Sequence, residues 1–345
     1  MWKHPSGEQV SEISANRDGT IYLVSKHNRI TALDKATGHL RWKVKLPASE
    51  SLNAENHSVF VSGRHHRCYL TSHSGMLYAI DGTKGKILWQ HRIAKTPLNA
   101  PALDDAGILY FSYADGHGGG VFAAFDPMRK RFRWLKKTQG VVVAPAVFDQ
   151  NKTLYFGTSK GWVYALTSQQ GHQKWCFAPK TRSPCWEEIT CSICIGGNNS
   201  LYLSVSGRQP KVVPFWGAIR CLNAVNGQLR WQTAESNGCH SSVVAGRNGM
   251  VYFQPDTTTL KALSSRNGKR KWERNVECEG GQPILSASGE IIAKTAAGIG
   301  AFDSETGKQK WSFPFVNIVN DPIQGIQQEL LLINREGDVF AIGVR

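Results

Sequence analysis

The sequence predicts an all-β fold: a single eight-bladed β-propeller of four-stranded antiparallel blades that spans residues 1–345. One phrase ending in Trp recurs along the chain, and a column of small residues and a column of Tyr residues recur with it. The phrases are 39 to 56 residues apart, which is the length that four short strands and their turns require.

Each phrase consists of a strand, a turn and a second strand. The first copy runs from Ala32 through Asp34 and Gly38 to Trp42. The Asp side chain can accept hydrogen bonds from turn amides, and Gly can adopt the positive φ that the turn needs. The turn of the third copy, Asp126 to Lys130, contains no Gly.

Two further columns repeat in step with the phrase, and both count eight positions. A small residue recurs in the first strand of the phrase: Ala32, Ala79, Ala124, Ala165, Cys221, Ala262, Ala301 and Ala341. An aromatic or aliphatic residue recurs in the preceding strand: Tyr22, Tyr69, Tyr110, Tyr155, Tyr202, Tyr252, Ile292 and Leu331. We expect both columns to be core, Cys221 included.

The eighth unit lacks its last strand, because the chain ends shortly after Ala341. Trp2 lies 40 residues before Trp42, so we expect the N-terminal segment around Trp2 to form the fourth strand of the last blade and to remove the free edges. The repeat tryptophans are then structural, and they are Trp2, Trp42, Trp89, Trp134, Trp175, Trp231, Trp272 and Trp311.

The pattern Ala-x-Asp-x-x-x-Gly-x-x-x-Trp, complete from Ala32 to Trp42 and varied in the other units, resembles the PQQ-like repeat family. The resemblance covers nearly the whole chain and implies the fold. It also implies that the signature Trp packs between adjacent blades. The family includes quinoprotein dehydrogenases, BamB-like assembly lipoproteins, and sensor or scaffold domains, so the fold does not settle the function.

Few residues of the chain fit the chemistry of a quinoprotein. PQQ and Ca²⁺ would need oxygen ligands and a general base near the propeller axis. The chain has no Cys-Cys pair, and the candidate carboxylates are scattered: Glu12, Glu187, Glu188, Glu279 and Asp321. We therefore predict no catalytic residues, no metal site and no cofactor. PQQ and Ca²⁺ remain expectations only of the alternative reading, a quinone-dependent dehydrogenase.

The fifth unit carries two insertions, at about residues 179–188 and 207–216. Insertions on a propeller face are frequent places for binding residues. The candidates combine charge with aromatic surface, and they are Trp186, Arg208, Lys211, Phe215 and Trp216. The alternative is a loop that folds its aromatic residues back onto the blade.

The cysteines of the fifth unit include Cys191 and Cys194. This spacing suggests zinc or redox chemistry when it lies on a turn. We expect an inner strand over Ile189–Ile195, in which residues three apart point to opposite faces. Structural cysteines are therefore favoured.

The chain carries 41 Lys+Arg against 26 Asp+Glu, a formal charge of +15. A solvated basic surface is the commoner explanation, but such a surplus also attracts polyanions. One basic cluster lies at the outer hairpin of the third unit, and we call its first four members the basic rim: Arg129, Lys130, Arg131 and Arg133, followed by Lys136 and Lys137. A second basic cluster comprises Arg266, Lys269, Arg270, Lys271 and Arg274. The basic rim is the candidate of the two that we define as a site. It is a candidate binding surface for an anionic partner.

These observations favour a non-enzymatic binding scaffold, monomeric as a domain, whose main partner is another protein. Polyanion binding through the basic rim is the second alternative. No run of 18 apolar residues predicts a transmembrane segment. The compartment stays open: cytoplasmic if the start is native, periplasmic or secreted if a signal peptide has been removed.

Overall fold

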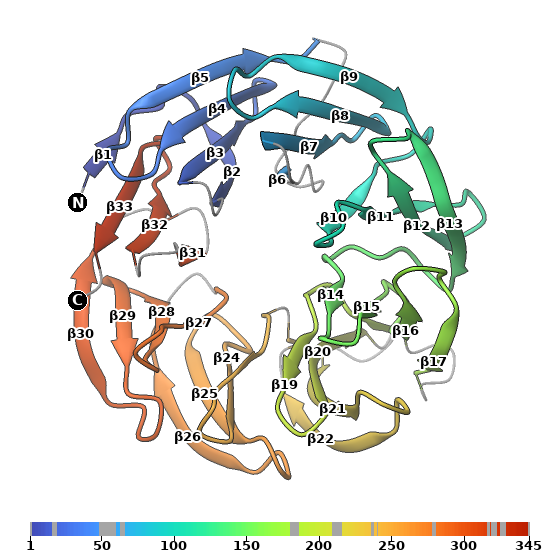
Figure 1. Cartoon of the computed structure of the whole chain (residues 1–345). Coiled ribbons are helices and arrows are strands. Elements are labelled where there is room, and N and C mark those ends of the chain that lie inside the picture. The colour runs from blue at the N-terminus through green and yellow to red at the C-terminus, as the bar shows by residue number, and fades with distance from the viewer. Residues whose placement is uncertain are drawn as a thin grey trace. The chain divides into compact units, whose positions relative to one another are not determined.

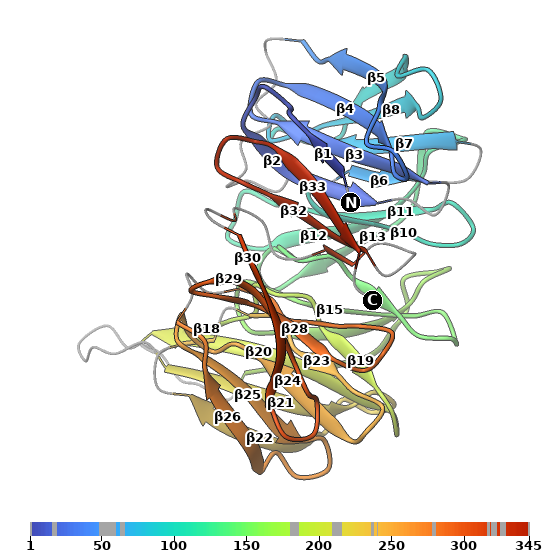
Figure 2. The same ribbon diagram turned by 90° about the vertical axis from the view of Figure 1, so that its left-hand side faces the viewer.

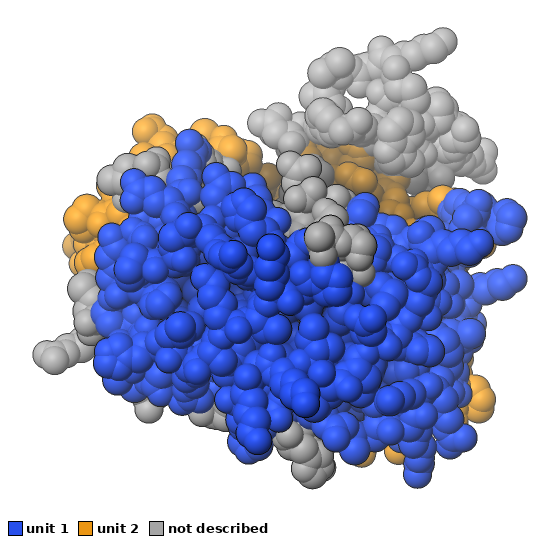
Figure 3. All heavy atoms as spheres, turned by 90° about the horizontal axis from the view of Figure 1, so that it is seen from above, with its two compact units in different colours: residues 1–137, 317–345 blue, residues 138–316 orange. Residues whose placement is uncertain are grey.

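The alternation of short strands with Gly- and Asp-containing turns produces a structure made of antiparallel sheets. The computed structural model describes residues 2–15, 19–47, 60–62, 66–179, 186–208, 216–235, 238–239, 241–277, 281–315, 318, 323–324 and 329–343. The chain divides into two compact units, residues 1–137 with 317–345, and residues 138–316 (Figure 3). Each unit contains four blades.

The blades of the first unit are numbered one, two, three and eight in chain order. Their strands are β2 (Val10–Ala15), β3 (Thr20–Ser25), β4 (Arg29–Asp34) and β5 (Leu40–Lys45); β6 (Phe60–Ser62), β7 (Arg67–Thr71), β8 (Met76–Asp81) and β9 (Ile87–Arg92); β10 (Asn99–Leu103), β11 (Leu109–Ala114), β12 (Gly120–Asp126) and β13 (Arg131–Thr138); and β31 (Ile323–Gln324), β32 (Glu329–Ile333), β33 (Val339–Gly343) and β1 (Trp2–His4).

The second unit holds blades four to seven. Their strands are β14 (Val147–Phe148), β15 (Thr153–Gly157), β16 (Val163–Thr167) and β17 (Gln173–Phe177); β18 (Trp186–Glu188), β19 (Cys194–Gly196), β20 (Ser200–Arg208), β21 (Trp216–Asn223) and β22 (Leu229–Glu235); β23 (Val244–Ala245), β24 (Met250–Phe253), β25 (Thr259–Ser264) and β26 (Arg270–Asn275); and β27 (Ile284–Leu285), β28 (Ile291–Thr295), β29 (Gly298–Phe302) and β30 (Gln309–Pro314).

The predicted fold class is confirmed: the eight repeat units form eight blade sheets, the fold of an eight-bladed β-propeller. The predicted role of the N-terminus is also confirmed. Strand β1 pairs antiparallel with β33, with Trp2 opposite Ala341, and the two strands lie side by side in Figures 1 and 2. Both ends of the chain therefore contribute to the eighth blade.

The three repeating columns form one row across each blade. In the first blade Tyr22 pairs with Ala32, and Ala32 pairs with Trp42. The Tyr and Trp rings lie 5.9 Å apart on either side of the alanine, which is fully buried. A larger residue than Ala would separate the two rings, and this explains why the column holds only small side chains, Cys221 among them.

The repeat Trp also reaches the turn of the next blade. The Trp42 indole N–H donates to the Gly82 carbonyl at 2.7 Å, and a Cβ on Gly85 would lie 2.6 Å from the Trp42 ring. The same pair of contacts joins Trp2 to the turn at Gly38 and Trp272 to the turn at Gly307. These tryptophans therefore link neighbouring blades, as the family resemblance implies.

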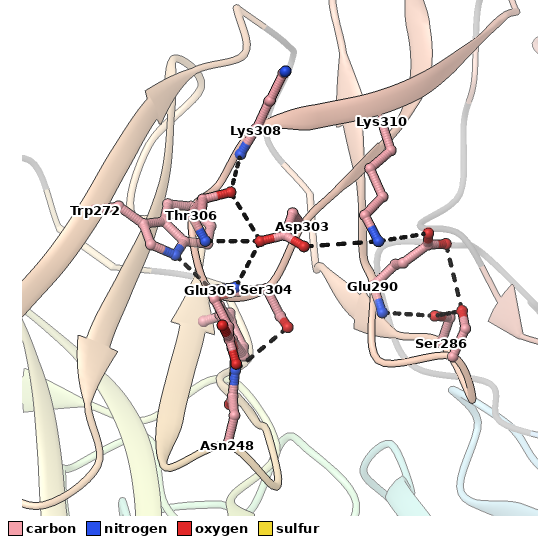
Figure 4. A network of polar contacts seen from close by, with 12 residues as sticks. Asn248, Trp272, Ser286, Glu290, Asp303, Ser304, Glu305, Thr306, Lys308 and Lys310 are labelled. Atoms are coloured by element: carbon pink, nitrogen blue, oxygen red, sulfur yellow. Dashed lines mark hydrogen bonds and ion pairs between the residues drawn. The ribbon is translucent and has the colours of Figure 1, made fainter.

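Figure 4 shows one such turn with its polar contacts. The Asp303 carboxylate accepts hydrogen bonds from the Thr306 amide at 2.9 Å and the Thr306 hydroxyl at 2.8 Å. Trp272 donates to the carbonyl of Ser304 at 3.0 Å. The Asp of the repeat thus fixes the turn onto which the preceding blade's Trp packs.

The turn of the third blade replaces Gly by Lys130, and the structure shows how. Lys130 adopts φ of 53°, the left-handed conformation that Gly adopts in the other turns. Its ammonium lies 5.7 Å from the centre of the Trp89 ring. A cation–π contact therefore takes the place of the close Trp–Gly packing at this blade.

We expect Lys130→Gly to change the free energy of unfolding by less than about 1 kcal/mol. It removes left-handed strain of about 1–2 kcal/mol and a cation–π contact of about 0.5–1 kcal/mol. In contrast, Gly85→Ala adds both strain and a clash with Trp42, and we expect a loss of about 1–3 kcal/mol. Denaturant unfolding measures both variants, and a neutral Gly85→Ala would contradict this view of the turn.

The Asp side chains of the turns should make the stability of the fold depend on pH. Hydrogen bonds from Arg41 and Thr37 lower the pKa of Asp34 from 3.8 to about 2. A carboxyl group whose pKa is lower in the folded state than in the unfolded state stabilises the folded state at pH values above its unfolded-state pKa. This stabilisation is lost as the pH falls toward the folded-state pKa. We expect unfolding free energy to decrease between pH 3.8 and about 2, and Asp34→Asn to weaken that decrease in urea titrations. An identical pH dependence in both proteins would contradict it.

One local prediction is wrong. Of the inner strand expected over Ile189–Ile195, only Cys194 and Ile195 lie in a strand, β19, and Cys191 lies in the segment between β18 and β19. Strand β18 pairs with the end of β20, and β19 pairs with its beginning. Cys194 lies opposite Tyr202, the position that Val147 occupies opposite Tyr155 in the fourth blade. Residues of the first insertion thus add a strand to the sheet, and β19 takes the usual place of the first strand.

Candidate functional site

The basic rim lies at the turn between β12 and β13, and its centre is a buried carboxylate. Asp126 is 5% exposed and accepts hydrogen bonds from the amides of Met128 and Arg129, each at 3.1 Å. The Arg133 guanidinium donates to its other oxygen at 3.3 Å, and that of Arg129 lies 3.7 Å away. Burial by itself raises the pKa of Asp126, but these hydrogen bonds outweigh it and lower the pKa.

Because one carboxylate faces two guanidinium groups, the rim keeps a positive surplus. Arg131 is exposed at the start of β13, and Arg129 keeps 64% of its side chain exposed. Beside the charges lies an open hydrophobic side chain, since Met128 is 57% exposed. The four predicted rim residues therefore lie on this turn and at the start of β13. The surface there is both cationic and apolar.

A small hollow of about 310 Å³ adjoins this turn. Tyr69 of the second blade and Ile108 of the third form its apolar part, and Arg129 and Arg133 form its basic part. Met and Arg are enriched in protein interfaces, whereas Lys is depleted. Asp126 and Met128 also line the hollow, so apolar, basic and acidic groups meet there.

The fifth-blade candidates lie at the ends of a long hairpin. Trp186 pairs with Arg208 across β18 and β20, and Trp216 begins β21 opposite Gly207. The Trp216 ring is half-buried against Gly207, whose added Cβ would lie 2.3 Å from it. Lys211 and Phe215 lie outside the described residues. The binding role of this group stays a prediction.

A buried ion pair in the same blade was not anticipated. Arg220 donates to both oxygens of Glu187 at 2.5 and 2.8 Å, and both side chains are at most 5% exposed. Gln232 accepts a further hydrogen bond from Arg220 at 2.7 Å, and the Phe177 ring lies 5.7 Å from the guanidinium. Glu187, a candidate cofactor ligand by sequence, is therefore already occupied within its blade.

Both cysteines of the fifth-blade spacing, Cys191 and Cys194, lie within the described residues. Cys191 is buried, and burial raises the pKa of the half-buried Cys194 thiol. A raised pKa disfavours the thiolate that metal binding or redox exchange requires. Within the described ranges, no three His, Cys, Asp or Glu side chains are arranged to hold a metal ion. Nor does the described part of the chain contain a helix suited to crossing a membrane.

Comparison with known proteins points to one family. The family model described as outer membrane protein assembly factor BamB matches residues 1–92, 49–183 and 212–343. BamB of Yersinia pestis is 22% identical over 78% of this chain and 67% of its own length. The structure of BamB from Moraxella catarrhalis superposes with a TM-score of 0.72 at 13% identity, covering 100% of this chain and 97% of that one, which shows a shared fold.

Quinoprotein dehydrogenases match over a shorter stretch. The quinoprotein ethanol dehydrogenase of Pseudomonas aeruginosa is 32% identical over 35% of this chain. The chain spans only 20% of the length of that dehydrogenase.

Proposed function

The chain belongs to the family described as outer membrane protein assembly factor BamB, and from that premise we propose that it is a non-enzymatic scaffold that binds another protein. The extent of the matches carries the proposal. BamB of Yersinia pestis aligns with 78% of the chain, whereas the Pseudomonas aeruginosa dehydrogenase aligns with 35%. An assembly factor acts by contact with other proteins, and a propeller offers a broad surface for it.

The basic rim is the contact surface that we propose. The exposed side chains of Arg129 in the rim and of the neighbouring Met128 supply the cationic and apolar groups that protein interfaces favour. Asp126 holds the turn in place through its hydrogen bonds, so little ordering is needed on binding. We infer an acidic segment with an apolar side chain as the matching partner surface.

Affinity capture with the full chain tests this assignment. We expect the wild-type chain to retain a defined set of proteins from its native source, and Arg129→Glu/Arg131→Glu to lose them. Lys84→Glu/Lys86→Glu is the matched control, because it reverses two exposed charges at the equivalent turn of the second blade. Equal retention by both variants would contradict a role for the rim.

The same experiment separates the polyanion alternative. Binding of nucleic acid through phosphates weakens steeply as salt rises. A protein interface with an apolar centre keeps part of its affinity. Retention that is abolished by nuclease treatment would favour a nucleic acid over a protein partner.

A further inference from the structure

A larger cavity lies in the second unit, between the fifth and sixth blades. Its volume is about 700 Å³, which is within the range of small-molecule sites. The β19–β20 hairpin of the fifth blade forms one wall, and the β23–β24 hairpin of the sixth blade forms the other. Three arginines line it, Arg230, Arg247 and Arg266.

The described lining of this cavity contains no acidic residue. Six residues before the column Tyr, the third and fourth blades carry Asp104 and Asp149, which accept hydrogen bonds from Tyr110 and Tyr155 at 3.0 Å. The position is not acidic in the first, second, seventh and eighth blades either, where it is Asn16, Gly63, Ser286 and Gly325. In the two blades that form the cavity it is Gly196 before Tyr202 and Gly246 before Tyr252. Both glycines line the cavity, and none of its described lining residues is Asp or Glu.

A second position of the repeat is also neutral here. The strand-end residue is Asp in four blades, but it is Ser264 in the sixth. The adjoining Ser265 and Arg266 line the cavity. Neither position of the repeat therefore supplies a negative charge at this cavity.

The arginines consequently keep their charge unneutralised. Arg41 and Arg133, which precede the repeat Trp of their blades, form ion pairs with the turn Asp at 2.8 and 3.3 Å. Arg230 precedes Trp231 in the same way but donates to the Asn198 carbonyl at 2.8 Å and the Ser200 hydroxyl at 2.7 Å. Among the described residues, the three cavity arginines form no ion pair with an acid.

We propose that this cavity binds a small soluble anion that carries phosphate groups. Guanidinium groups match phosphate through paired hydrogen bonds, and three of them favour a ligand with more than one negative charge. The Ser200 hydroxyl and the Asn198 carbonyl orient Arg230 toward this space. The inference does not depend on the protein partner proposed above, because it uses different residues.

Pyrophosphate is the probe for this site, measured by isothermal titration calorimetry on the full chain at low salt. We expect saturable binding with one site. Arg247→Gln/Arg266→Gln should weaken it at least about tenfold, since it removes two of the three guanidinium groups that line the cavity. Lys269→Gln/Lys271→Gln is the matched control, because it removes two exposed charges of the β25–β26 hairpin, which also carries Arg266, and both lysines lie outside the cavity. We expect less than about a twofold change in affinity.

A variant that restores the repeat gives an independent test. Ser264→Asp introduces the residue that other blades carry at this position, so the fold should tolerate it, and we expect weaker pyrophosphate binding. The proposal is overturned if wild type does not bind pyrophosphate, or if the arginine variant and the lysine control weaken it equally. Binding only to phosphatidylglycerol vesicles would likewise contradict a soluble ligand.

Discussion

Replacing Glu187 by Gln is expected to lower the free energy of unfolding by about 3–5 kcal/mol, the cost of leaving a buried charge without its partner. Arg220 is 4% exposed, and the two carboxylate oxygens of Glu187 are its charged acceptors. Gln232 would remain, but it accepts from one nitrogen only. Urea unfolding followed by intrinsic fluorescence measures the change.

Two controls make this result specific. Glu273→Gln breaks an exposed ion pair with Arg270, whose side chain is 65% exposed, and should cost less than about 1 kcal/mol. The double variant Glu187→Leu/Arg220→Met should recover much of the loss, because an apolar pair leaves no buried charge. If Glu187→Gln costs no more than Glu273→Gln, the pair does not stabilise the fifth blade as described.

The second large effect concerns the Trp column. We expect Trp42→Ala to lower the free energy of unfolding by about 3–5 kcal/mol. The indole is 7% exposed, packs on Gly85 of the next blade and donates to Gly82. Both contacts disappear together, and a cavity remains between the blades.

Leu88→Ala is the comparison for that experiment, because Leu88 is 43% exposed on the last strand of the second blade. Its loss should stay within about 0.5 kcal/mol, as for other surface changes. Equal effects of the two substitutions would mean that the repeat Trp does not link the blades.

The number of blades could be predicted from the sequence because each blade repeats the same contacts between the same kinds of residue. Tyr22, Ala32 and Trp42 are ten residues apart along the chain yet lie in one row across three strands. Most blades keep an aromatic residue, a small residue and a Trp at these three positions, so the repeat can be recognised in the sequence. The closing strand followed from the same reasoning, since Trp2 completes the row of the eighth blade opposite Ala341.

Features that depend on pairs of distant residues were not visible in the sequence. Glu187 and Arg220 are 33 residues apart in the chain, and neither occupies one of the three repeating columns. The additional strand β18 of the fifth blade depends on where β20 continues beyond its usual length. The cationic cavity was not visible in the sequence either, because Arg230, Arg247 and Arg266 belong to three different hairpins and only the fold brings them to one cavity.

The central claim is that this chain works through its surfaces rather than through a quinone cofactor. Thermal unfolding of the full chain with and without PQQ and Ca²⁺ tests it most directly, because a ligand that binds the folded state raises Tm. We expect an unchanged Tm and no dye-linked oxidation of alcohols. A Tm that rises with both additions together, accompanied by alcohol oxidation, would contradict the account.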